Sequence, residues 1–253
     1  MSIRPISEAT HRVSEQEVLV IENVVVRYGK VTAVRGVSLN VKCGETAIII
    51  GPNSAGKSSL LEAVGAKMPG RTIEGSASLA GRSLLNLGTR ERWQIGVRLV
   101  PQGRQIYPSL TVADNLRVIA ENVGVEWNDV LETTHSLLPA QFSERLKLRL
   151  KIPAGNLSGG EQQMLALARV LVGKVSMLLL DEPGLGLAPR ITQEFAAAIG
   201  QWAKAGIGIL MTDQALRRWV RVVNKVYILV RGHLSEYGQS EESIDQLIAQ
   251  MEK

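Results

Sequence analysis

The chain has 253 residues, 45% of them hydrophobic, and carries a formal net charge of +5. That length is enough for one large domain or two lobes, and no apolar run approaches the roughly 18–20 residues that span a bilayer. A single cysteine excludes a disulfide within the chain, and the 29 basic residues are scattered among 24 acidic ones, so charge alone selects no partner.

The N-terminal quarter begins with a polar stretch, residues 1–17, which we expect to be a flexible tail. Val18–Val26 and Ala33–Val41 follow as β-rich segments, and Thr72–Leu79 is a further candidate strand. Tyr28 ends the first of these segments. An aromatic ring there could stack on a purine or pack on the core, and the sequence supports both interpretations equally.

A phosphate-binding loop is the strongest pattern, since Gly51–Ser59 fits G-x-x-x-x-G-K-[ST]. The apolar run Thr46–Ile50 predicts a buried strand before it, and Leu60–Met68 predicts a helix after it. This order places a helix N-terminus, with unpaired N–H groups, against the phosphates of a nucleotide. Lys57 would then reach the β- and γ-phosphates, and the Ser58 hydroxyl would bind Mg²⁺. A chance glycine turn is the alternative, which the flanking strand and helix disfavour.

The middle of the chain is predicted to be mostly helical. Val97–Gln102 reads as a strand that stops at proline, and Thr111 with Asp114 forms a capping box that opens a helix. From there to about Asn156 helices and loops alternate. This region therefore looks like a helical lobe inserted between two parts of an α/β core.

A second strong pattern is Leu157–Gln163, with the sequence LSGGEQQ. Ser158 and Glu161 form a capping box, which explains those two residues without any function. The pair Gly159–Gly160 is not explained that way, because glycine costs a helix about 1 kcal/mol relative to alanine. Glycine there suits an anion that approaches the helix N-terminus closely.

Two carboxylates follow the apolar strand Met177–Leu180. Ligands of parallel sheets bind beyond the carboxyl ends of the strands, where Asp181 and Glu182 lie. One carboxylate could hold Mg²⁺ and the next could orient and deprotonate a water. An acidic helix start is the alternative interpretation.

The C-terminal part continues with alternating helices and strands. Pro189 begins a helix whose apolar face is Ile191, Phe195, Ala198, Ile199 and Trp202, and Gly206 ends it. Strands are predicted at Ile207–Thr212 and Lys225–Val230, with a helix between them that carries Arg217, Arg218 and Arg221. Gly232 marks a turn that includes His233, and a closing amphipathic helix is expected near the end.

These elements in this order resemble the ATP-binding cassette (ABC) ATPases over about residues 18–240. The resemblance implies an α/β P-loop NTPase fold, with a mostly parallel sheet core, an antiparallel β subdomain and an inserted helical subdomain at about 103–157. A C-terminal helix would occupy 241–253. Within the superfamily the segments LSGGEQQML, DEPGLGLAP and VPQGR are most similar to LivF-type ATPases of branched-chain amino-acid importers.

The resemblance also implies roles for particular residues. Tyr28 would stack on adenine, Gln102 would sense Mg²⁺ and the attacking water, Asp181 would bind Mg²⁺ and Glu182 would be the catalytic base. The nucleotide phosphates would be held by Gly51, Pro52, Asn53, Ser54, Ala55, Gly56, Lys57, Ser58 and Ser59. Ser158, Gly159 and Gly160 would contact the γ-phosphate bound to an opposing subunit, which requires a dimer.

Three positions depart from the superfamily pattern. Ser54 stands where the loop usually has glycine, Ala188 where many relatives have an aspartate, and Gln214 where most have a histidine that steadies the γ-phosphate and the base. LivF-type chains share the last two replacements. Gln214 can donate a hydrogen bond but carries no charge, so we hypothesise a dimer with a different ATPase and two unequal composite sites.

The function implied by this resemblance is ATP hydrolysis that powers an importer, with ATP and Mg²⁺ as the bound groups. The partners would be a second ABC ATPase, two transmembrane permease subunits and a substrate-binding protein, with the chain peripheral on the cytoplasmic face of the inner membrane and no nucleic acid bound. One alternative is a weakly hydrolysing regulatory subunit. Another is a soluble ABC ATPase acting on ribosomes or DNA, although such proteins usually carry two cassettes or a long heptad insert.

Overall fold

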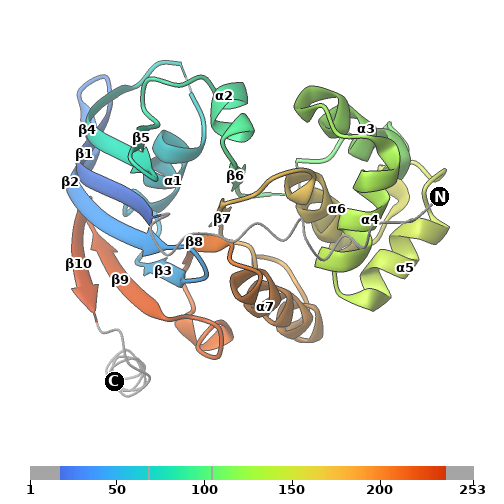
Figure 1. Ribbon diagram of the computed structural model, residues 1–253. Helices are drawn as coiled ribbons and strands as arrows, with labels where there is room; N and C mark the ends of the chain where they lie inside the picture. Colours follow the sequence, from blue (N-terminus) through green and yellow to red (C-terminus); the bar gives the residue numbers. More distant parts are fainter. Residues whose placement is uncertain (1–17, 68, 104, 238–253) are drawn as a thin grey trace.

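The computed structural model describes residues 18–67, 69–103 and 105–237, which form two β-sheets and seven α-helices (Figure 1). The expected N-terminal tail and the helix expected at 241–253 lie outside the described residues.

The smaller sheet is antiparallel and contains strands in the order β2-β1-β4-β5. Its strands are β1 (Val18–Tyr28), β2 (Val31–Lys42), β4 (Thr72–Leu79) and β5 (Arg82–Ser83). β1 and β2 form a hairpin in which Tyr28 pairs with Val31. Tyr28 therefore lies at the tip of the hairpin, where the residue is 37% exposed.

The larger sheet contains six strands in the order β10-β9-β3-β8-β7-β6, all parallel except β10. Its strands are β3 (Thr46–Ile50), β6 (Val97–Val100), β7 (Met177–Asp181), β8 (Gly208–Asp213), β9 (Lys225–Val230) and β10 (His233–Tyr237). In β7, Leu178 and Leu180 join one hydrophobic cluster while Met177 and Leu179 join the other. A strand covered on both faces must be apolar throughout, which explains the continuous apolar run.

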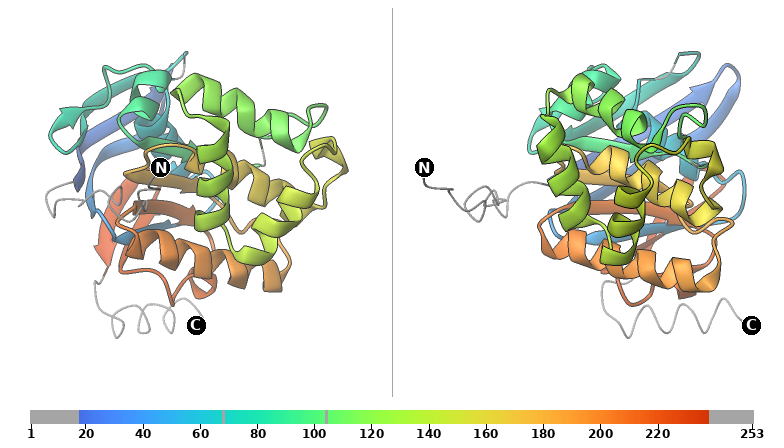
Figure 2. Two further views of the ribbon diagram at one scale, coloured as in Figure 1. Left: turned by 45° about the vertical axis from the view of Figure 1, so that its right-hand side comes forward. Right: turned by 90° about the vertical axis from the view of Figure 1, so that its right-hand side faces the viewer.

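Helices cover both faces of the larger sheet. The helices are α1 (Lys57–Gly65), α2 (Thr89–Gln94), α3 (Val112–Val123), α4 (Trp127–Leu137), α5 (Ala140–Leu148), α6 (Gly159–Leu171) and α7 (Pro189–Lys204). α1 shares one cluster with the antiparallel sheet, while α6 and α7 share the other. Helices α3, α4 and α5 contact α6 on the side away from the antiparallel sheet (Figures 1 and 2).

The fold predicted from the sequence is confirmed: a mostly parallel core, an antiparallel sheet and helices inserted between β6 and α6. The subdomain limits of about 103 and 157 stay predictions. Among the described residues, no helix has both the length and the apolarity needed to cross a membrane.

The capping predictions hold to different degrees. At α6, Ser158 Oγ accepts from the Glu161 N–H, and the Ser158 N–H donates to the Glu161 carboxylate at 2.9 Å, so the box is complete. At α3, Thr111 Oγ1 accepts from the Asp114 N–H at 3.1 Å, but the Asp114 carboxylate takes the Thr111 hydroxyl instead of its N–H. Aspartate is one methylene shorter than glutamate, and only half of the box forms.

Two local predictions are wrong. The helix expected to carry Arg217, Arg218 and Arg221 is a single 3₁₀ turn, Leu216–Arg218, because the chain turns back at Trp219, whose indole donates to the Asp213 carboxylate. The turn at Gly232 is present, but His233 begins strand β10, which pairs with β9.

Candidate functional site

The loop 51–56 joins the buried strand β3 to helix α1, as its glycines and small residues predict. Gly56 is the N-cap residue of α1 with φ = 106°, and a Cβ there would lie 2.3 Å from the carbonyl oxygen of Ala33. Glycine is thus the only residue that fits. The Ala55 carbonyl accepts a hydrogen bond of 3.0 Å from the Gly232 N–H, which ties the loop to the β9–β10 turn.

Ser54 lies in the left-handed region with φ = 63°. A non-glycine residue pays roughly 1–2 kcal/mol for that conformation. This conformational cost explains why glycine is usual at this position. Because the serine side chain is small, we expect it to add little steric cost beyond that of the backbone conformation.

The start of α1 is suited to an anion. The first N–H groups of a helix have no partners within it, Gly56 supplies no side-chain cap, and the first turn contains no acidic residue. Lys57, a residue that is 5% exposed, adds an ammonium group. Its Nζ donates to the carbonyl oxygens of Gly51 at 2.8 Å and Pro52 at 3.1 Å. A positive helix end and a buried cation therefore meet at one place.

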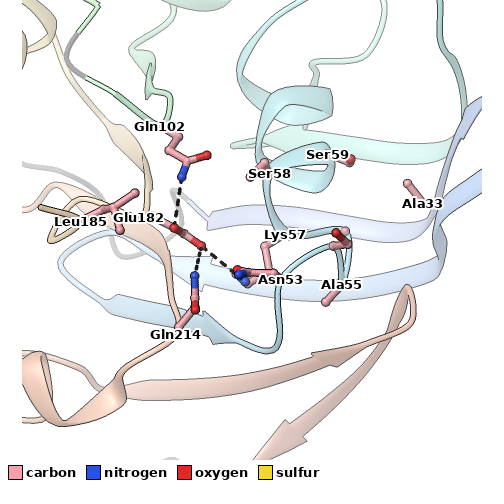
Figure 3. A pocket seen from close by; sticks show the side chains of 12 residues that line it. Ala33, Asn53, Ala55, Lys57, Ser58, Ser59, Gln102, Glu182, Leu185 and Gln214 are labelled. Carbon is pink, nitrogen blue, oxygen red and sulfur yellow. Dashed lines mark hydrogen bonds and ion pairs between the residues drawn. The ribbon is translucent and has the colours of Figure 1, made fainter.

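Glu182 is the centre of a polar cluster that comes from three other segments (Figure 3). Its Oε1 accepts a hydrogen bond from Gln214 Nε2 at 3.1 Å and lies 3.6 Å from Lys57 Nζ. Its Oε2 accepts from Gln102 Nε2 at 3.3 Å. The side chain is 10% exposed, and these contacts hold both carboxylate oxygens in place.

The backbone of Glu182 is also unusual, with φ = 46°. Residues other than glycine adopt this conformation at a cost and keep it only where surrounding contacts enforce it. Here the Glu182 N–H donates to Thr212, 3.1 Å from the carbonyl oxygen and 3.0 Å from Oγ1. The strained backbone aims the carboxylate at Lys57.

Asp181 is buried beneath this cluster, with 3% exposure. Its Oδ1 accepts a hydrogen bond of 2.6 Å from Thr212 Oγ1, and within the described part of the chain no hydrogen bond reaches its Oδ2. Thr212 thus supports both acidic residues, although it was not among the residues predicted from the sequence. Parallel pairing of β7 with β8 places Thr212 opposite Asp181, and no local pattern reveals such a pairing.

Replacing Thr212 with valine is expected to lower the free energy of unfolding by about 1.5–3 kcal/mol, because the Asp181 carboxylate loses a buried donor. Urea unfolding would measure this. Thr46→Val is the matched control: Thr46 is equally buried on β3, but its hydroxyl has no partner in the described part of the chain. That change should stay within about 0.5 kcal/mol of the original. Equal losses for the two variants would contradict the role given to Thr212.

A cavity of about 570 Å³ brings most of the predicted residues together. It is lined by Ala33, Asn53, Ser54, Ala55, Gly56, Lys57, Ser58, Ser59, Gln102, Glu182, Leu185 and Gln214. Ala33 and Leu185 were not predicted. Seven predicted positions lie outside the lining. They are Gly51 and Pro52, whose carbonyls accept from Lys57, together with Asp181, Tyr28, Ser158, Gly159 and Gly160.

Tyr28 is linked to the cavity through Ser59. Its hydroxyl donates to Ser59 Oγ at 3.2 Å, and the Arg71 guanidinium lies 5.0 Å from its ring centroid. Arg71 in turn pairs with Glu62 at 2.8 Å. The ring is therefore held in place beside the phosphate loop, and the expectation that it stacks on adenine stays a prediction.

Ser158, Gly159 and Gly160 begin helix α6 and do not line the cavity. Glu161 anchors this turn, because its carboxylate also accepts from Arg149 at 3.0 Å. Burial disfavours the charge of Glu161, but the hydrogen bonds from Ser158 and the charge of Arg149 outweigh it and lower the pKa of Glu161. Ala188, at the N-cap of α7, contributes no side-chain hydrogen bond.

A glycine-rich loop between a buried parallel strand and a helix, with a lysine and a carboxylate facing each other across one cavity, defines a P-loop nucleotide-binding protein. Residues 34–184 match the family described as ABC transporter. The chain therefore belongs to the ABC transporter family of ATP-binding proteins, which hydrolyse ATP.

Relatives agree with this assignment. The chain is 36% identical to the high-affinity branched-chain amino acid transport ATP-binding protein BraG of Pseudomonas aeruginosa, over 82% of this chain and 86% of the relative. It is 31% identical to the probable branched-chain amino acid transport ATP-binding protein LivF of Archaeoglobus fulgidus, over 83% and 86%. A crystal structure of the ADP conformation of an ATP-binding cassette of an ABC transporter superposes with a TM-score of 0.76 at 26% identity, over 92% of this chain and 95% of the other.

Proposed function

We propose that the chain is the ATP-hydrolysing subunit of an importer for branched-chain amino acids or a related small amide or organic acid. One observation carries the catalytic part: the Glu182 carboxylate faces the phosphate loop and is held by Gln102, Gln214 and Lys57. The names of the relatives BraG and LivF support the substrate class.

The phosphates of ATP would bind the N–H groups at the start of α1 and the ammonium of Lys57. Glu182 would orient the attacking water and take its proton as general base. Gln102 and Gln214 would keep the carboxylate in place, and Gln214 would donate to the γ-phosphate. Each of these roles uses a polar group that already lines the cavity.

Mg²⁺ would be held by Ser58, Gln102 and Asp181, whose hydroxyl, amide and carboxylate oxygens are the hard ligands this ion prefers. The donors fit, because the Oδ2 of Asp181 takes no hydrogen bond among the described residues and Gln102 uses only its Nε2 on Glu182. The ion would neutralise charge on the phosphates.

Ser158, Gly159 and Gly160 would act on a second subunit, since they lie outside this chain's own cavity. Packing within the chain does not explain glycine at 160, because a Cβ there would lie 3.5 Å from its nearest neighbour, a side-chain carbon of Ile191. That is an ordinary van der Waals distance. Close approach of a γ-phosphate bound to an opposing subunit accounts for the glycine.

A matched pair of variants tests this reading of Gly160. Gly160→Ala and Gly200→Ala both add a methyl group 3.5 Å from a side-chain carbon of this chain, and both lie in helices. Neither should destabilise the fold, because alanine favours a helix over glycine by up to about 1 kcal/mol. Only Gly160→Ala should lower ATP turnover of the assembled complex, by about tenfold. Equal turnover in both variants would argue against contact across a dimer.

The proposed partners are a second ABC ATPase, two transmembrane permease subunits and a substrate-binding protein. The chain would lie peripherally on the cytoplasmic face of the inner membrane, with no nucleic acid bound. Gln214 and Ala188 motivate pairing with a different ATPase, so that the two composite sites are unequal.

Introducing Glu182→Gln in this chain and the equivalent change in the partner, one at a time, tests whether the two composite sites are unequal. Equal losses of turnover would refute unequal sites.

A weakly hydrolysing regulatory subunit is the second candidate, favoured by the uncharged Gln214. The contacts of Glu182 with Gln102 and Lys57 favour hydrolysis instead. Full transport and ATPase activity of the complex with Lys57→Ala in this chain would favour the regulatory function.

The substrate class can be tested with the complex reconstituted in liposomes together with its binding protein. ATP-driven accumulation of radiolabelled leucine, isoleucine or valine is expected, and a small amide or organic acid is tested in parallel. Accumulation of none of these would remove the substrate part of the proposal while leaving ATP hydrolysis intact.

A further inference from the structure

A second layer of contacts lies behind Glu182 and Gln214, at the ends of strands β7 and β8. Asp213 is 4% exposed, and its Oδ1 accepts hydrogen bonds from the N–H groups of Gln214 at 2.6 Å and Ala215 at 2.9 Å. Its Oδ2 accepts from the indole Nε1 of Trp219 at 2.7 Å. The Asp213 carboxylate therefore fixes the backbone that carries Gln214.

Trp219 connects this carboxylate to the turn that follows Glu182. Its ring is fully buried and packs edge-on against Phe195 of α7, with centroids 5.9 Å apart. On another side it contacts the backbone at Gly184, where a Cβ would lie 2.8 Å from the ring and 3.4 Å from Asp213 Oδ2. Only glycine allows this approach. One buried pair thus touches both chain segments that bring Gln214 to Glu182.

We propose that Asp213 and Trp219 form a positioning pair that holds the Gln214 amide against the Glu182 carboxylate. The pair acts through Gln214 and touches no substrate. This inference rests on the proposed function, in which Glu182 is the general base and Gln214 its uncharged partner.

The physical need for such a pair comes from glutamine itself. A glutamine side chain has three rotatable bonds, and holding it in one rotamer costs conformational entropy. A charged side chain at position 214 could offset this entropy cost by its long-range attraction to the Glu182 carboxylate. Gln214 is uncharged and has no such attraction. The 3.1 Å hydrogen bond from Gln214 to Glu182 therefore depends on the position of the Gln214 backbone, from which the side chain extends. Small misplacements of such groups reduce rates strongly.

Trp219→Phe tests the pair, because it removes the indole N–H and keeps an aromatic ring in the space. The matched control is Trp202→Phe. Trp202 is also fully buried, also packs edge-on against Phe195, and also donates its Nε1 to one acceptor, the Leu137 carbonyl at 2.6 Å. That acceptor ends helix α4, away from the cavity. Both changes should lower the melting temperature by roughly 2–10 °C.

Only Trp219→Phe is expected to reduce the kcat for ATP hydrolysis of the complex captured with this chain, by about tenfold, with the KM for ATP within about twofold. In a chain that already carries Gln214→Ala, adding Trp219→Phe should change kcat by less than about twofold, since there is no amide left to position. An equal loss in both backgrounds, or an equal loss from Trp202→Phe, would overturn the positioning role. If Trp219→Phe does not fold, Asp213→Asn takes its place in the same cycle.

Hydrogen exchange separates this inference from the proposed function, because it needs no ATP turnover. The amides of Gln214 and Ala215 should exchange about tenfold faster in Trp219→Phe and stay unchanged in Trp202→Phe. Unchanged exchange in both variants would overturn the positioning pair even if Glu182→Gln abolishes turnover. Faster exchange confined to Trp219→Phe would support the pair even if Glu182→Gln leaves turnover intact, a result that would remove the proposed catalytic role of Glu182.

Discussion

Glu182→Gln is expected to lower the ATP turnover of the site built on this chain by about 10²–10⁴-fold, the range that general bases contribute. Glutamine keeps the size of the side chain but cannot take a proton from water. Binding of ATP should persist, because the loop and Lys57 are unchanged. Phosphate release at saturating ATP measures the first effect, and binding of a fluorescent ATP analogue measures the second.

Glu45→Gln is a suitable control for this change. Glu45 also lies near a buried lysine, with its Oε1 3.9 Å from Lys225 Nζ, and it does not line the cavity. Its replacement should leave turnover within about twofold of the original. Turnover in Glu182→Gln that equals turnover in Glu45→Gln would mean that another group activates the water.

Lys57→Ala should weaken ATP binding by about 10- to 100-fold, because each hydrogen bond from an ammonium to a phosphate contributes about 1.5–3 kcal/mol. The change also removes the donor that the Gly51 and Pro52 carbonyls share, so the loop loses an internal support. Titration of the fluorescent analogue against the purified chain gives the dissociation constant.

The control for Lys57 is Lys225, the other lysine that is buried among the described residues. It is 4% exposed, lies on β9 and donates to Asn40 Oδ1 at 3.0 Å. Lys225→Ala should reduce stability and leave ATP affinity unchanged. The binding role of Lys57 would be contradicted if both variants bound ATP as tightly as the original chain.

The sequence predicts those parts of the fold that depend on neighbours along the chain. The strand Thr46–Ile50, buried on every residue, reads as an apolar run because both faces of the sheet are covered. The two residues of the capping box, Ser158 and Glu161, are only three positions apart, and Pro189 fixes the start of α7. Of the predicted apolar face of α7, only Ile191 is half-buried, while Phe195, Ala198, Ile199 and Trp202 are buried.

Local sequence patterns do not predict contacts between residues on neighbouring strands. Thr212 meets Asp181 only because β7 and β8 pair in parallel, thirty-one positions apart in the sequence. The arginines after Gln214 have helical spacing, yet Asp213 and Trp219 bond to each other and turn the chain back after one 3₁₀ turn. Strand β10 was missed because its five residues, His233–Tyr237, alternate weakly and derive their order from pairing with β9.

The most direct test of the central claim is to capture this tagged chain from detergent-solubilised membranes and measure ATP hydrolysis by whatever co-purifies. The proposed function predicts two polytopic membrane proteins and a second ATPase, with turnover that falls when Glu182→Gln is introduced. Capture of a ribosome or nucleic acid, or of no membrane protein at all, would contradict an importer subunit.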